Sequence, residues 1–187
     1  MSPEPRLTDH DDAVLLRQLQ QGDPNALDLL YRRYGQRLFA LAYSMLGRRP
    51  EHYADAEDIL QESLLGAFKS ARRFEGRSSL ATWLSRIVAN QVLAFRRYRG
   101  VRRAESLDET LAPPGNSVGD PSARLDVERL LSALSEEHRD VIILRELHGL
   151  SYEEMAEVLG IPKGTVESRL FRARQALREK FPEFGGG

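Results

Sequence analysis

The fold is decided by residues 150–177, which have the sequence LSYEEMAEVLGIPKGTVESRLFRARQAL. Ser151 followed by Glu154 is typical of a capping box, so a helix is expected to begin here and to end at Gly160. A second helix is expected to begin directly after a turn that contains Pro162. Two short helices joined by a glycine turn are the plan of a helix-turn-helix.

The expected second helix has two faces of different character. Helical spacing puts one apolar set on the buried side: Val166, Leu170, Ala173 and Leu177. The outer side carries Gly164, Ser168, Phe171, Arg172 and Gln175, beside a basic run of Arg169, Arg172, Arg174, Arg178 and Lys180. In the first helix, the inward set is expected to be Tyr152, Ala156 and Leu159. The major groove of DNA admits a helix, so the outer face is a candidate for reading DNA; the alternative is a helical hairpin with a solvated basic face.

Composition limits the class of protein. The chain has 187 residues, 41% of them hydrophobic but only 7% aromatic, which predicts small aliphatic cores. It contains no cysteine, so disulfides and thiolate metal sites are excluded. No apolar run is long enough to span a membrane, and residues 1–12 are unlike a signal peptide. We therefore expect a cytoplasmic protein.

Charge is segmented along the chain, although the formal net charge is only −1. Residues 51–62 have a net charge of −5, residues 69–103 of +9, residues 104–140 of −6 and residues 163–180 of +4. The basic segments suit phosphates, and the acidic segments suit a different partner.

Helical periodicity extends over most of the chain. Further helices are expected to begin at Asp11 or Asp12, Pro24, Asp55, Leu80, Leu125 and Ser135. The stretch 104–124 is acidic and contains three prolines, as expected of a flexible linker. The prediction is an all-α fold of two small helical domains, residues 11–103 and 125–181, with a disordered lead (1–10), the linker (104–124) and a flexible tail (182–187).

Two surfaces of the first domain are candidates for binding. The expected helix after Asp55 has an outer face that carries Asp58, Gln61 and Glu62. Acids in a first turn are explained by the helix dipole, but Glu62 lies two turns in, which favours docking of a basic protein partner. The second surface is basic, with five Arg between Arg96 and Arg103. Its aromatic neighbours, such as Trp83, either stack on unpaired bases or belong to the core.

Taken together, the sequence resembles the extracytoplasmic-function (ECF) sigma factors of bacterial RNA polymerase over residues 12–181. Residues 55–68, DAEDILQESLLGAF, are similar to region 2.2, which docks on the clamp of the polymerase β′ subunit. Residues 74–90, FEGRSSLATWLSRIVAN, are similar to regions 2.3 and 2.4, which capture the melted −10 element. Residues 144–174 are similar to region 4, which reads the −35 element.

The resemblance implies a role for each matching residue. Core-polymerase contacts are implied for Asp58, Gln61 and Glu62. Contacts with −10 DNA are implied for Gly76, Arg77, Ser78, Ser79, Trp83, Arg86, Asn90, Arg96 and Arg97, where the loop and Asn90 hold a flipped base and the Arg side chains bind phosphates. Contacts with −35 DNA are implied for Arg145, Lys163, Ser168, Arg169, Phe171 and Arg172. Glu167 departs from many relatives, which place Lys or Arg there, so their −35 sequences are not transferable.

The resemblance also implies a function and partners. It implies a subunit that binds core RNA polymerase and promoter DNA, is held inactive by an anti-sigma factor, and needs no cofactor. The acidic linker either threads the polymerase cleft or is simply polar. The alternative is a stand-alone helix-turn-helix regulator that binds an operator without polymerase. An enzyme is not expected, because the four His have no metal-ligand spacing and neither a P-loop nor a G-x-S-x-G motif occurs.

Overall fold

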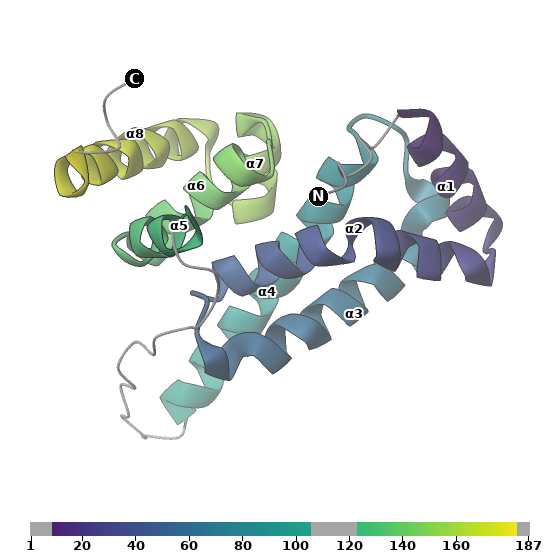
Figure 1. Ribbon diagram of the computed structural model, residues 1–187, viewed down its shortest axis with the longest axis horizontal. Coiled ribbons are helices and arrows are strands. Elements are labelled where there is room, and N and C mark those ends of the chain that lie inside the picture. Colours follow the sequence, from purple (N-terminus) through teal and green to yellow (C-terminus); the bar gives the residue numbers. More distant parts are fainter. Residues whose placement is uncertain (1–8, 106–122, 183–187) are drawn as a thin grey trace.

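The computed structural model describes residues 9–105 and 123–182, and the regular elements in these ranges are all helical (Figure 1). The predicted all-α fold is confirmed. Most of the predicted lead, linker and tail, at residues 1–8, 106–122 and 183–187, lies outside the described residues. The elements are α1 (Asp9–Gln21), α2 (Pro24–Met45), η1 (Pro50–His52), α3 (Tyr53–Ser70), η2 (Ala71–Arg73), α4 (Leu80–Glu105), α5 (Ala123–Ser132), α6 (Glu136–Ile142), η3 (Ile143–Leu147), α7 (Tyr152–Leu159) and α8 (Lys163–Lys180).

The N-terminal group, α1 to α4, is built around α2. Helices α1, α3 and α4 all pack against α2, and α3 also packs against α4. Each contributes an aliphatic stripe to the core, as the low aromatic content predicts: Leu15, Leu19, Leu30, Leu38, Leu41, Leu60, Leu64, Leu84, Val88 and Val92 are all buried. Tyr31, which follows Leu30 on α2, is 55% exposed.

Several helix boundaries differ from the sequence-based expectation. Helix α1 begins at Asp9, before Asp11, and α3 begins at Tyr53, before Asp55. Helix α4 continues to Glu105, into the stretch predicted as a linker. Its last residues include Arg102, Arg103, Ala104 and Glu105, which favour helix, and the single Gly100 does not end it. The ends of the predicted linker, at residues 104–105 and 123–124, are therefore helical.

The C-terminal group, α5 to α8, departs from regularity at one place. Helix α6 begins as predicted at Ser135, whose side chain accepts a hydrogen bond from the backbone N–H of His138. It then passes into a single π-helical turn, η3, where a regular helix was expected. Because a π turn holds an extra residue, it shifts the apolar register, and Leu147 is left 46% exposed while Leu150 is buried.

The helix-turn-helix forms at α7 and α8 as the sequence predicts. The Ser151 hydroxyl accepts from the Glu154 N–H at 3.2 Å, and the Glu154 carboxylate accepts from the Ser151 N–H at 2.8 Å, which completes the capping box. Gly160 ends α7 with φ of 65°, a left-handed conformation that glycine adopts without strain. The sequence predicts that Ala156 and Leu159 of α7 point inward. The buried residues are instead Met155 and Val158, each one position earlier.

The two groups touch one another. Helix α4 packs against α7, and α2 packs against α6 and η3 (Figure 1). None of the helices in residues 9–105 and 123–182 has the length and apolar character to cross a membrane.

Candidate nucleic-acid interface

The outer face of α3 presents an acidic surface that no other part of the described chain covers. Asp58, Gln61 and Glu62 are all exposed, while Ile59 and Leu60 on the opposite side are buried in the core. Within residues 9–105 and 123–182, no hydrogen bond or ion pair engages any of the three polar side chains, and Leu65, one turn further on, is 47% exposed. We define Asp58, Gln61, Glu62 and Leu65 as the docking face.

The loop before α4 is exposed and turns sharply. Gly76 has φ of 71°, and Arg77, whose side chain is 86% exposed, pairs with Glu75 at 2.6 Å. The Ser79 hydroxyl accepts from the Thr82 N–H at 3.1 Å and so caps the start of α4, while Ser78 reaches only the Ser79 carbonyl. These residues form an open edge at the N-terminus of a long helix, where a negatively charged group is stabilised.

The aromatic side chain at the start of α4 belongs to the core margin. Trp83 is half-buried and packs on Phe74, with ring centroids 5.0 Å apart. Its ring thus supports the loop that carries Gly76. The sequence leaves open whether Trp83 stacks on unpaired bases or belongs to the core. In the structure, packing covers most of the Trp83 surface.

The polar side chains of α4 that were predicted to contact DNA divide into two sets. Asn90 and Arg97 are exposed, with no hydrogen bond or ion pair to the part of the chain that the structure describes. Arg86 and Arg96 instead reach across to the C-terminal group, where Arg86 pairs with Glu157 and Arg96 pairs with Asp140. Of the three arginines, the structure therefore leaves Arg97 open to a phosphate backbone and engages Arg86 and Arg96 internally.

The exposed face of α8 carries the side chains expected for base reading. Ser168, Phe171 and Arg172 are exposed on the side opposite the buried Val166 and Leu170, and Phe171 is 64% exposed. The Phe171 ring is therefore accessible to a partner. The orientation suits insertion into a major groove.

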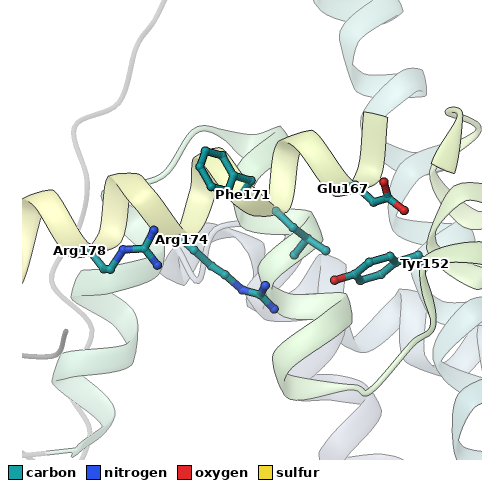
Figure 2. Close-up of a pocket in the computed structure, with 6 residues that line it drawn as sticks. Tyr152, Glu167, Phe171, Arg174 and Arg178 are labelled. Atoms are coloured by element: carbon teal, nitrogen blue, oxygen red, sulfur yellow. The ribbon is translucent and has the colours of Figure 1, made fainter. Parts of the chain in front are cut away.

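A pocket lies along one flank of this face (Figure 2). Figure 2 shows Glu167 and Tyr152 at one end and Arg178 at the other, with Phe171 and Arg174 between them. Arg174 donates to Glu146 at 2.5 Å, and this carboxylate raises the pKa of the Arg174 guanidinium. No hydrogen bond or ion pair in the described ranges holds the Glu167 carboxylate.

Three other predicted contacts lie at the margins of this surface. Arg145 donates to the Leu150 carbonyl at 2.8 Å and stacks over Tyr152, so it braces the turn into α7. Lys163 pairs with Glu153 at 2.6 Å, which lowers the pKa of that carboxyl. Arg169 turns to the opposite flank of α8, where it pairs with Glu137 at 2.8 Å.

Comparison with known proteins identifies the architecture. The family model described as "Sigma-70 region 2" matches residues 30–102, and that described as "Sigma-70, region 4" matches residues 124–177. The chain is 35% identical over 183 residues to the ECF RNA polymerase sigma-E factor of Salmonella typhimurium strain LT2, covering 90% of this chain and 93% of the relative. The chain belongs to the ECF sigma factors. The corresponding protein of Escherichia coli K12 is 34% identical, with the same coverage of both chains.

Two solved structures resemble this sigma factor over most of their length. CnrH, solved in complex with the cytosolic domain of CnrY, superposes with a TM-score of 0.61 at 28% identity and covers 92% of this chain and 97% of its own. The sigma factor RpoE of Bartonella quintana, solved with the anti-sigma factor NepR, gives 0.57 at 28% identity, with coverage of 91% and 93%. The resemblance stated from the sequence is confirmed.

The structure also places residues at these surfaces that the sequence analysis did not assign to a site. In this sigma factor, Tyr152, Arg174 and Arg178 line the pocket beside Phe171, and Leu65 extends the docking face. The spacing of 167, 171, 174 and 178 is that of one helix flank, so the α8 members could have been found from periodicity. Tyr152 could not, because it comes from the other helix.

Proposed function

We propose that this sigma factor binds core RNA polymerase through the docking face of α3 and directs it to promoters through α4 and α8. The observation that carries the proposal is the exposure of Asp58, Gln61 and Glu62, which have no partner among residues 9–105 and 123–182 and lie on a helix whose other side is fully used in the core. Carboxylates left without partners on one face are suited to a basic surface on another protein. The exposed Leu65 would add apolar area at the same place.

At the −10 element, the proposed contacts are to a single strand. Asn90 and Arg97 lie exposed along α4, and Gly76 to Ser79 form the open edge at the N-terminus of the same helix. Extruding a base costs a few kcal/mol, so a surface that holds it stabilises the open strand. Arg86 and Arg96 would join these contacts after their internal ion pairs are released.

At the −35 element, the proposed contacts are in the major groove. Ser168, Phe171 and Arg172 would face the base edges, and Lys163 and Arg145 would lie toward the backbone. Glu167 lies on the same face without a partner, and the base-edge group that suits a carboxylate is the cytosine N4 amino group. We expect this position to distinguish the −35 element of this protein.

The proposed partners follow from the family and its relatives. CnrH was solved with CnrY and the Bartonella RpoE with NepR, so an inhibitory protein partner is proposed here as well. The protein would act in the cytoplasm, without catalysing a reaction itself. The acidic linker would lie between the two DNA-binding surfaces when polymerase holds them apart.

Run-off transcription tests this proposal. Core RNA polymerase, the purified sigma factor and a pool of genomic fragments from its source should give defined start sites, and charge reversal by Gln61→Lys with Glu62→Lys should lower the transcript yield at least about tenfold. Glu51→Lys is the matched control, since Glu51 is exposed on η1, outside α3. Normal holoenzyme formation by the double variant would refute the docking assignment. Tight operator binding without polymerase would instead indicate the stand-alone regulator.

A further inference from the structure

Arg96 of α4 is held by two other helices. Its guanidinium donates to both carboxylate oxygens of Asp140 in α6, at 2.7 and 3.2 Å, and to the backbone carbonyl of Met45 at the end of α2. Two parallel N–H to oxygen bonds form the strongest geometry available to an arginine, and a phosphate group offers it the same arrangement. Asp140 therefore occupies the position that a DNA phosphate would take.

This ion pair is largely removed from water. The Arg96 side chain is 18% exposed and that of Asp140 only 7%. The neighbouring Arg139 does not compete for Arg96's place, because it donates to the backbone carbonyls of Leu131 and Leu134. Removing one member of a buried pair is strongly destabilising, since the other is left charged without a partner. The pair thus fixes the contact between the two helical groups.

Two further contacts join the same groups. Arg86, also on α4, pairs with Glu157 of α7. The Ser85 hydroxyl lies 3.3 Å from Nδ1 of His148, and both side chains are buried at the contact. Arg86, Ser85 and Arg96 lie along one helix, so the C-terminal group covers a continuous length of α4.

We propose that Asp140 and Glu157 form an intramolecular latch, in which carboxylates of the C-terminal group take the place of −10 DNA phosphates on Arg96 and Arg86. The latch rests on the proposed function, because it assumes that these two cations bind the −10 strand. Arg96, which is buried and bound to both Asp140 oxygens, cannot also bind a phosphate, and Glu157 competes for one N–H group of Arg86, so latch closure opposes −10 binding at these residues. The free chain is then self-inhibited, and whatever separates the two groups activates the −10 surface.

The latch is tested by opening it in the full-length chain. The protein has no cysteine, so labels can be placed at Glu57→Cys and Glu179→Cys, both exposed and outside the contact, to measure the distance between the groups. Asp140→Asn should broaden this distance distribution and raise the affinity for a mixed-sequence single-stranded oligonucleotide at least about tenfold. Glu157→Gln, at an exposed carboxylate, should change both quantities in the same direction but less.

The matched control is Glu146→Gln, which breaks the Arg174 ion pair inside the C-terminal group and removes the same charge. It should leave the interdomain distance unchanged. An unchanged distance in both Asp140→Asn and Glu157→Gln would overturn the latch, and so would an opened chain with unaltered affinity for the oligonucleotide. Failure of the wild-type chain to support transcription with core polymerase would count against the proposed function, and the distance measurement does not depend on that result.

Discussion

Acidification is expected to separate the two helical groups, because of the buried imidazole at their contact. His148 is 6% exposed, and its burial, together with the nearby positive charge of Arg37, lowers its pKa from 6.5 to about 4. The Ser85 hydroxyl donates to the Ala81 carbonyl at 2.9 Å, so it accepts from the Nδ1–H of a neutral imidazole. Protonating His148 therefore places an unstabilised charge at the contact.

The sign and size of the effect follow from linkage. If opening returns His148 to its ordinary pKa, the open chain binds the proton more tightly, so acid favours opening between pH 6.5 and about 4. Lowering the pH from about 7.5 to about 5 then weakens the closed form by about 2 kcal/mol, or about 30-fold in the ratio of open to closed chains. Burial raises the pKa of Asp140 while its pairing with Arg96 lowers it, so this carboxyl also titrates and adds its own pH dependence.

The interdomain distance at several pH values is the assay. His148→Gln keeps a polar side chain but removes the titration, so the difference in pH response between it and the wild type isolates the imidazole from Asp140. We expect the wild type to open more steeply with acid than the variant. Identical responses would show that the burial of His148 comes from the C-terminal group alone, and the reasoning above would be refuted.

The remaining predictions concern the helix-turn-helix. Ser151→Ala removes one capping hydrogen bond and should lower the free energy of unfolding by about 1 kcal/mol in a denaturant titration. Gly160→Ala places a side chain at φ of 65° and should cost about 1 kcal/mol or more in the same assay. Leu170→Ala, at a position 1% exposed, should cost about 2–5 kcal/mol. Glu167→Arg should shift the preferred base at one −35 position from cytosine to guanine, by about 1–3 kcal/mol, in transcription from a randomised −35 library; an unaltered preference would remove Glu167 from the base-reading set.

The parts of the fold that the sequence predicts are those set by local chemistry. The Ser151 capping box, the Gly160 turn and the stripe through Val166 and Leu170 each depend on residues within one or two helical turns. The inward face of α7 was misplaced because the helix has only eight residues, so two overlapping apolar sets fit it. Which set is buried depends on how the neighbouring helices pack against α7, and this packing is not determined by the local sequence.

The candidate site shows the same division, with a consequence for function. Composition identifies the arginines of α4 as a phosphate-binding group, and for Arg97, which is exposed, the structure leaves that role open. Composition does not reveal that Arg96 already has a partner, because Asp140 lies 44 residues further along the chain, within an acidic segment. A charge-segmented chain of nearly zero net charge can satisfy its own cations before it meets DNA. The acidic stretch 104–140 therefore need not serve an external partner alone, since its Asp140 pairs with a cation of the surface proposed for promoter DNA.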